Sequence, residues 1–259
     1  MTLPRPAPRE RFAAIDVGSN SIRLVVAEYD PVAGLTIIDE VKDQPRLARG
    51  LAATGILDDM AMARALETLD RMREVCERRG VKRIAAVATS AVRDARNGAL
   101  FLDRVRKRLG LPLRVIDADE EARLSFRSVA RHFRLEQGRS VVADIGGGSL
   151  ELVSAVKGVI QRKLSLPWGA VRLTERFKLD RKDPRDQVDA LRADVRKTLR
   201  KTLPPREWAG GTIIGSGGTF TNLARMTVAR RTGAVPDAVH GTVVTASEVE
   251  QLLEWLIEL

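Results

Sequence analysis

The chain contains one short motif twice, and this repeat limits the folds available to it more than any other feature of the sequence. Placing Asp16 over Asp144 aligns identical residues along the whole motif. The further identities are Gly18 with Gly146, Ser21 with Ser149, Leu24 with Leu152, Val25 with Val153 and Ala27 with Ala155. Each copy reads as an apolar strand, an aspartate, a tight turn with glycine and serine, and a returning strand. A supersecondary unit that occurs twice indicates two related halves.

The remaining sequence alternates between strand patterns and helix patterns, which is typical of an α/β layered fold. Asp58 is the expected N-cap of a helix that ends before Gly80 and that buries Cys76 in the core. Residues 89–94 are expected to form a loop before a helix that runs to about Leu109. Further expected elements are hairpins at 12–30 and 140–157, strands at 84–88, 113–116 and 212–214, and helices from Asp119, over 178–206, and from a capping box of Ser247 and Glu250.

The length of 259 residues exceeds the usual size of one domain. We expect an N-terminal domain at residues 1–124, in which 1–11 form a flexible lead-in, and a second domain at 125–259 that is truncated at its C-terminus. The chain has no apolar run of the ~20 residues that cross a bilayer, and its first residues lack the apolar segment of a secretory signal. We therefore expect no membrane association and a cytoplasmic location.

The net charge of +10 favours an anionic partner, because a positive field concentrates acidic ligands. Aromatic residues make up only 4% of the chain, which does not favour a single-stranded nucleic acid as that partner. The alternative is a basic, solvated surface without a specific ligand. One cysteine and two histidines give no zinc pattern. Any metal ion would therefore bind carboxylates, phosphate and water, which favours Mg²⁺ or Mn²⁺.

The two repeated turns have the composition of phosphate-binding loops. Glycine lets backbone amides crowd around an anion, and a serine hydroxyl adds a further donor. The aspartate before each turn would repel phosphate unless a cation lies between them. A single copy is more simply a hairpin with a glycine turn, but two copies favour a pair of loops that grip phosphate from both sides of a cleft. The loop residues are Gly18, Ser19, Asn20, Ser21, Gly146, Gly147, Gly148 and Ser149.

A third glycine turn is expected from Gly215 to Thr219, between a strand and a helix. The N-terminus of a helix can bind an anion, so Gly217 and Gly218 are candidate phosphate ligands. The spacing is not that of a dinucleotide-binding fingerprint, and no Walker lysine follows.

Five motifs in this order resemble the exopolyphosphatase and guanosine pentaphosphate phosphatase family over nearly all of the chain. They are Asp16 to Ser21, Thr89 to Arg93, the Glu-Glu-Ala-Arg string from Glu120, the Asp-Ile-Gly-Gly-Gly-Ser-x-Glu string from Asp144 to Glu151, and the loop at Gly215. The resemblance implies the fold shared with actin, sugar kinases and chaperone ATPases. It implies two ribonuclease-H-like α/β domains with the active site in the cleft between them, in the short-chain form of the family.

The resemblance also implies roles for individual residues. Glu121 is similar to the residue that positions and deprotonates the attacking water, although by itself it would be an ordinary solvated residue of a helix. Asp16, Asp144 and Glu151 resemble the acids near a magnesium-phosphate cluster, and Arg93 resembles an arginine that contacts phosphate.

The implied reaction is hydrolysis of the terminal phosphoanhydride of inorganic polyphosphate, with release of orthophosphate. Guanosine pentaphosphate on the same site is an alternative, as is a sensor that binds polyphosphate or an alarmone without cutting it. Further alternatives are an ATP-dependent kinase or ATPase on the same fold and a nucleic-acid binder. The sequence is also compatible with a homodimer.

Overall fold

A computed structural model of the chain describes residues 9–179 and 184–258. The chain divides into two compact units, Met1–Asp117 and Ala118–Leu259, which we call unit 1 and unit 2 and describe separately. The helix that begins at Ala118 is grouped with unit 2. The boundary that we place after residue 124 therefore falls inside this helix.

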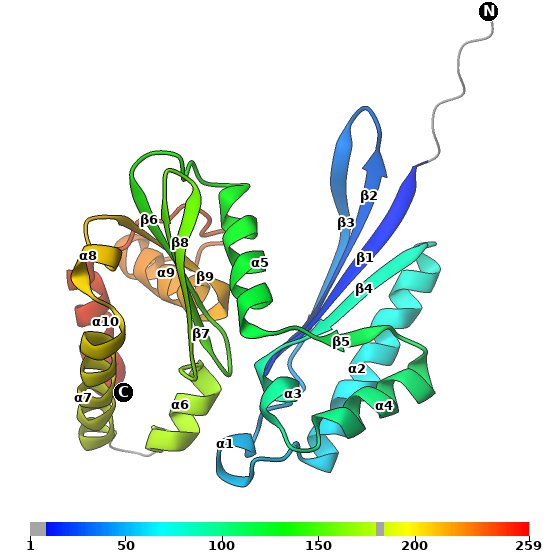
Figure 1. Ribbon diagram of the computed structural model, residues 1–259, viewed down its shortest axis with the longest axis horizontal. Coiled ribbons are helices and arrows are strands. Elements are labelled where there is room, and N and C mark those ends of the chain that lie inside the picture. The colour runs from blue at the N-terminus through cyan, green and yellow to red at the C-terminus, as the bar shows by residue number, and fades with distance from the viewer. Residues whose placement is uncertain (1–8, 180–183, 259) are drawn as a thin grey trace, which may run out of the picture. The chain divides into compact units, whose positions relative to one another are not determined.

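Unit 1 contains a five-stranded sheet, sheet A, with the strand order β3-β2-β1-β4-β5 (Figure 1). Strands β1, β2 and β3 are antiparallel neighbours, whereas β4 and β5 run parallel to β1. The elements are β1 (Glu10–Val17), β2 (Ile22–Asp30), β3 (Gly34–Asp43), α1 (Leu51–Thr54), α2 (Asp59–Arg78), β4 (Arg83–Ala88), α3 (Ser90–Asp94), α4 (Gly98–Leu109) and β5 (Leu113–Val115).

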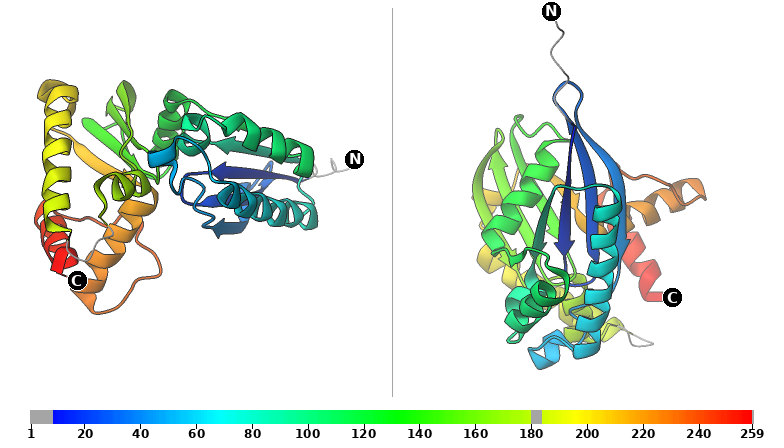
Figure 2. Two further views of the ribbon diagram at one scale, coloured as in Figure 1. Left: turned by 90° about the horizontal axis from the view of Figure 1, so that it is seen from below. Right: turned by 90° about the vertical axis from the view of Figure 1, so that its right-hand side faces the viewer.

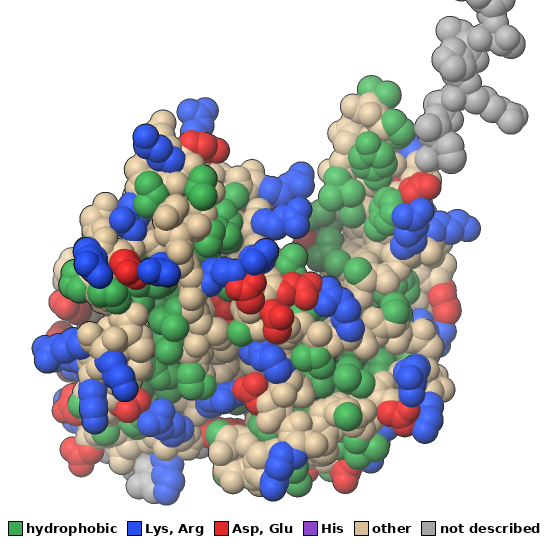
Figure 3. All heavy atoms as spheres, viewed as in Figure 1, with side chains coloured by type: hydrophobic (Ala, Val, Ile, Leu, Met, Phe, Trp, Pro, Cys, Tyr) green, Lys and Arg blue, Asp and Glu red, His purple; other side chains and the backbone are tan. Residues whose placement is uncertain are grey.

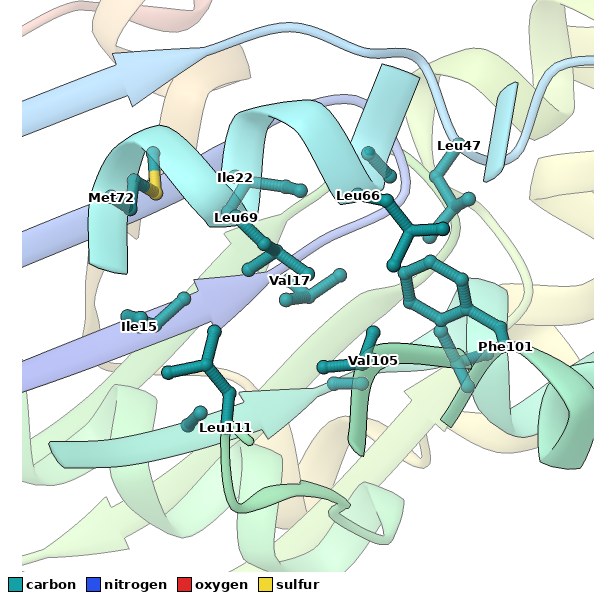
Figure 4. Packing of buried hydrophobic residues seen from close by; sticks show 14 of the residues in the cluster. Ile15, Val17, Ile22, Leu47, Leu66, Leu69, Met72, Phe101, Val105 and Leu111 are labelled. Atoms are coloured by element: carbon teal, nitrogen blue, oxygen red, sulfur yellow. The ribbon is translucent and has the colours of Figure 1, made fainter. Parts of the chain in front are cut away.

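The core of unit 1 lies on one face of sheet A. Alternate residues of β1, such as Ile15 and Val17, point to this face because successive side chains of a strand point to opposite sides. Helix α2 runs along the strands (Figure 2, right). Asp58 caps this helix by accepting a hydrogen bond of 2.9 Å from the Ala61 amide. Leu69 of α2 packs in this cluster, as Figure 4 shows from close by.

Unit 2 contains a four-stranded sheet, sheet B, with the strand order β8-β7-β6-β9. Helix α5 covers one face of this sheet with Ala122, Phe126 and Val129, which pack against Val142 and Val153. The other face carries a second cluster with Trp208 and Phe220 at its edge. The elements are α5 (Ala118–Ala130), β6 (Arg139–Ile145), β7 (Leu150–Val156), β8 (Val159–Leu166), α6 (Ala170–Phe177), α7 (Arg185–Thr202), α8 (Pro205–Trp208), β9 (Thr212–Ser216), α9 (Gly217–Thr232) and α10 (Ala246–Glu258).

The sequence repeat is also a repeat in three dimensions. The Gly18 amide donates to the Ser21 carbonyl at 3.0 Å, and the Gly146 amide donates to the Ser149 carbonyl at 3.0 Å. The pairing of the second strand with the third shifts after Val26 in unit 1 and after Ser154 in unit 2. These two positions are equivalent when Asp16 is placed over Asp144, so both copies share a turn and an irregularity of the ladder.

Several elements match the expectations from the sequence. Both hairpins form, helix α2 has the expected cap, and Cys76 is buried in the core. The predictions for residues 180–183 and for residues 1–8 of the lead-in lie outside the described residues. The lead-in was expected to extend to residue 11, but Glu10 and Arg11 already belong to β1.

Four local predictions are wrong, and two strands were missed. The helix expected over 178–206 is divided in its described part, where α7 ends at Thr202 and α8 begins at Pro205. Residues 90–94 form helix α3 rather than a loop. The segment from Gly215 to Thr219 is no separate turn, since β9 runs to Ser216 and α9 begins at Gly217. The capping box of the last helix lies two residues earlier, where the Thr245 amide donates to Glu248 Oε2 at 2.8 Å and the Glu248 amide donates to Thr245 Oγ1 at 3.3 Å. The third strands of the two sheets, β3 and β8, were not predicted.

No helix among residues 9–179 and 184–258 is long and apolar enough to span a membrane.

Candidate functional site

The first phosphate-loop candidate lies between β1 and β2 and is fixed by two neighbouring segments. The chain that follows β3 returns to this loop, where the Ala48 amide donates to the Ser19 carbonyl at 2.9 Å and the Arg46 amide donates to the Asn20 carbonyl at 3.1 Å. On the other side, the buried hydroxyl of Ser19 lies 3.0 Å from the buried hydroxyl of Ser90. The loop from Gly18 to Ser21 is therefore held in one shape before any ligand arrives.

Helix α3, which carries Arg93, begins beside this loop within unit 1. The Thr89 amide donates to the Val17 carbonyl at 3.1 Å, which places the start of α3 beside the end of β1. The Arg93 guanidinium donates to the Ile116 carbonyl at 3.2 Å and lies 3.6 Å from Asp94. Asp16, at the end of β1, is exposed.

The second loop, from Gly146 to Ser149, is fixed in the same way in unit 2. The Ala170 amide donates to the Gly146 carbonyl at 2.9 Å, and the Val171 amide donates to the Gly147 carbonyl at 2.9 Å. A side chain at Gly169 is excluded, because its Cβ would lie 2.1 Å from the backbone nitrogen of Gly148. Gly169 thus lets the start of α6 approach the loop closely.

Glu151 is a buried carboxyl directly beside the second loop, with 3% of its surface exposed. Burial raises the pKa of Glu151 to about 7, and the negative charges of Glu121 and Asp144 act in the same direction. Hydrogen bonds from Ser149 and Ser165 oppose this shift. The Ser165 hydroxyl donates to Glu151 Oε1 at 3.0 Å. Glu151 therefore changes its charge close to neutral pH.

Asp144, at the end of β6, is held from two sides. Its Oδ2 accepts hydrogen bonds from Ser125 of α5 at 2.9 Å and from Ser216 of β9 at 3.4 Å. Gly217 follows with a positive φ of 85°, and a Cβ at this position would lie 2.3 Å from Asp144 Oδ1. Only glycine leaves room for the carboxylate here, so Gly217 contributes space as well as a backbone amide.

Glu121 and Ser125 lie one turn apart on α5 and therefore share a face of this helix. Ser125 binds Asp144, and the charge of Glu121 acts on Glu151. Glu121, Asp144 and Glu151 thus form an electrostatically coupled group at one end of unit 2, which we call the carboxylate cluster.

The carboxylate oxygens of the carboxylate cluster suit a hard cation that keeps water or phosphate among its ligands. Like-charge repulsion contributes to the raised pKa of Glu151, and a divalent cation would relieve this repulsion. Within the described part of the chain, no group of three or more His, Cys, Asp or Glu side chains is arranged to hold a metal ion by itself. The residues therefore fit Mg²⁺ or Mn²⁺ with an incomplete protein shell better than a closed structural site.

Sequence reasoning missed the residues that hold the named ones in place. Two of the serines had a readable signal, since Ser90 lies in the Thr89 to Arg93 motif and Ser125 lies one turn after Glu121. Ser165, Ser216 and Gly169 gave none, because their contacts depend on how distant segments pair.

Comparison with known proteins gives consistent matches over most of the chain. Exopolyphosphatase 1 of Mycobacterium tuberculosis is 33% identical over 258 residues, which cover 95% of this chain and 72% of the relative. The crystal structure of an exopolyphosphatase from Cytophaga hutchinsonii overlaps with a TM-score of 0.82 at 28% identity, covering 96% of this chain and 80% of that one.

The crystal structure of the Aquifex aeolicus Ppx/GppA family member overlaps with a TM-score of 0.76 at 33% identity, covering 97% of this chain and 80% of that one. These overlaps confirm the predicted fold class, an α/β protein of two related units. The family model described as the Ppx/GppA phosphatase family matches residues 25–259. The chain belongs to the Ppx/GppA phosphatase family.

Proposed function

We propose that this protein is an exopolyphosphatase, a phosphoanhydride hydrolase that releases orthophosphate from the end of inorganic polyphosphate. The observation that carries the proposal is the carboxylate cluster beside a preformed glycine-serine loop of a kind that the chain builds twice. The relatives named exopolyphosphatase support the same substrate.

The two loops are proposed to bind phosphate oxygens. Each loop is closed by its own hydrogen bond and anchored by a returning segment, so little ordering is left to occur on binding. The Gly146 amide closes the turn, while Gly147 and Gly148 offer backbone amides that no side chain covers. Ser19, Asn20, Ser21 and Ser149 would add polar groups, and Arg93 would supply a planar cation that suits phosphoryl oxygens.

The first turn of α9 is a further proposed phosphate contact. Gly217 and Gly218 are the first two residues of this helix, where backbone amides have no partner within the helix. Asp144 lies beside Gly217, so an anion at this point would sit next to a carboxylate. That arrangement favours a phosphate that arrives together with a cation.

Glu121 is proposed as the general base that takes a proton from the attacking water. It is only partly buried, and it lies beside the buried Glu151 in the carboxylate cluster. A general base contributes a rate enhancement of ~10²–10⁴. The water attacks the terminal phosphorus on the side opposite the leaving phosphate chain. Orthophosphate and a chain that is one phosphate shorter are the products.

Asp16, Asp144 and Glu151 are proposed to hold Mg²⁺, with Mn²⁺ as a substitute. When bound, the ion neutralises charge on the terminal phosphates. Ser125, Ser216 and Ser165 orient two of these carboxylates.

A phosphate-release assay tests the proposal. Short and long polyphosphate, guanosine pentaphosphate and ATP are incubated with the chain, with and without Mg²⁺. Release from polyphosphate in the presence of Mg²⁺ is expected. Turnover of ATP with inert polyphosphate would instead indicate an ATPase. Tight polyphosphate binding without release by wild type or Glu121→Gln would indicate a sensor, and preference for guanosine pentaphosphate would identify the alternative substrate.

A further inference from the structure

Strand β8 directs two polar side chains toward helix α5 within unit 2. Lys163 and Ser165 are two residues apart on β8, so they point to the same face of sheet B. In the pairing of β8 with β7, Lys163 lies opposite Val153, which packs in the cluster that α5 completes. Leu164, between them, packs in the cluster on the other face. Lys163 and Ser165 therefore lie on the face of sheet B that α5 covers.

Lys163 forms an ion pair with Asp119 in the first turn of α5. In Figure 3, which uses the view of Figure 1, acidic side chains gather beside basic ones at the start of this helix. The other carboxylate oxygen of Asp119 lies 2.7 Å from Arg123 Nε, but Arg123 belongs to the same helix. The hydrogen bond from Lys163 is the main cause that lowers the pKa of Asp119 below its usual value. Asp119 is therefore charged near neutral pH, and its pair with Lys163 connects α5 to sheet B.

The apolar core holds α5 only from its second turn onward. The buried residues of this helix are Ala122, Phe126 and Val129, and none of them lies in the first turn. The side chain of Lys163 is 22% exposed, so its cation is partly buried against the start of the helix. The position of the first turn thus depends on a polar contact more than on packing.

The same strand also holds Glu151 of the carboxylate cluster. The Ser165 hydroxyl donates to Glu151 Oε1 at 3.0 Å. Glu121 follows Asp119 by two residues, and its charge acts on Glu151. Strand β8 thus fixes one carboxyl of the cluster through Ser165 and the helical turn that carries another through Lys163. Loss of the Lys163 contact would leave Glu151 in place but loosen the turn that carries Glu121.

We infer that Lys163 is a positioning residue for catalysis, which holds the first turn of α5 so that Glu121 keeps its place. The inference rests on the proposed function, in which Glu121 is the general base. Lys163 acts through Asp119 and needs no contact with the substrate. The placement of a catalytic group matters steeply, since a displacement of about 1 Å can lower a rate by roughly 100-fold.

Steady-state kinetics of phosphate release from polyphosphate test the inference. Lys163→Met keeps most of the length of the side chain but removes its charge. We expect a kcat that is ~10-fold to 100-fold lower, with little change in KM for polyphosphate. Lys163→Arg keeps a cation at this position and should retain most of the wild-type kcat. Circular dichroism checks that each variant is folded, so that a fall in kcat reports on the folded enzyme.

The partner of Lys163 provides a second route to the same contact. Asp119→Asn should lower kcat to a similar extent. The double variant Lys163→Met/Asp119→Asn should be no slower than the slower single variant, because both changes break one contact. Lys107→Met is the matched control, since it breaks an exposed i,i+4 pair with Asp103 on α4 of unit 1 and should leave kcat unchanged.

The outcomes separate this inference from the proposed function. Three results would overturn the inference alone: a wild-type kcat in Lys163→Met, a Lys163→Arg variant as slow as Lys163→Met, or losses that multiply in the double variant. If Lys163→Met does not fold, a wild-type kcat in Asp119→Asn overturns the inference instead. A wild type that releases no phosphate from polyphosphate would overturn the proposed function together with the inference.

Discussion

The Ser125 hydroxyl donates a hydrogen bond of 2.9 Å to Oδ2 of Asp144 and joins helix α5 to the end of strand β6. The same helix carries Glu121 one turn earlier. The hydrogen bond therefore fixes the helix that carries Glu121, the proposed general base, relative to Asp144, a proposed metal ligand. These two carboxylates are distant from each other in the sequence.

Removing this link should impair catalysis without unfolding the protein. Ser125→Ala deletes a hydrogen bond to a charged group, and we expect kcat about 10-fold to 100-fold lower, together with a higher Mg²⁺ requirement. Mn²⁺ binding followed by calorimetry gives a readout that is independent of turnover. Ser128→Ala, at an exposed position of the same helix, is the matched control. Wild-type kcat and metal affinity in Ser125→Ala would show that the link has no role.

Glu121→Gln should separate binding from cutting. The amide keeps the size of the side chain but cannot accept a proton, so we expect kcat for polyphosphate to fall by ~10²–10⁴. Polyphosphate should still bind. Phosphate release and filter binding measure the two effects, and Glu120→Gln on the same turn serves as the control. A Glu121→Gln variant with wild-type kcat would assign the base to another residue.

The buried Glu151 predicts an unusual dependence of stability on pH. Its pKa is about 7 in the folded protein and 4.5 in the reference state, so the folded state holds the proton more tightly. Its contribution to stability is fully present below about pH 4.5 and is lost as the pH rises through 7, by roughly 3 kcal/mol.

Urea unfolding of wild type and Glu151→Gln in metal-free buffer measures this effect, because the difference between the two proteins removes the other titrating groups. The free energy of unfolding of wild type, relative to that of Glu151→Gln, should fall between pH 4.5 and 7 and then level off. A difference that is constant with pH would mean that Glu151 ionises at its ordinary pKa.

Two glycines with positive φ should respond differently to alanine. Both Gly217→Ala and Gly233→Ala place a side chain in the left-handed region, at a cost of roughly 1–2 kcal/mol. A Cβ at Gly233 meets nothing within 4 Å, whereas a Cβ at Gly217 would lie 2.3 Å from Asp144 Oδ1. Gly217→Ala should therefore destabilise the protein more than Gly233→Ala does, and it should lower polyphosphatase activity. Gly233→Ala should leave polyphosphatase activity unchanged. Thermal unfolding and phosphate release measure both, and equal behaviour of the two variants contradicts the prediction.

The sequence predicted most of the elements whose patterns are strictly local. The two hairpins and α2 had regular spacing and turn or cap residues, and they form as expected. Strands β3 and β8 were missed because their charged residues leave no clean alternation, and they are held by pairing with β2 and β7. The last helix offered two possible capping pairs, and only the folded chain selects Thr245 with Glu248.

The candidate site was predicted in part. Glu121, Asp144 and Glu151 were named from motifs, and the structure brings them together in one unit. The serines that orient two of them could not be read from spacing alone, since Ser165 and Ser216 reach their carboxylates through strand pairing. The expectation that the active site lies in a cleft between two domains stays a prediction.

The shared shift in strand pairing after Val26 and Ser154 bears on the history of the gene. A one-residue irregularity at the same place in both halves implies that an ancestral single unit already possessed it before duplication. The halves then diverged in chemistry on an inherited frame, with Arg23 in one copy where the other has Glu151. An ancestor with two identical halves would have carried the same charge at both positions, and the present asymmetry is the later specialisation.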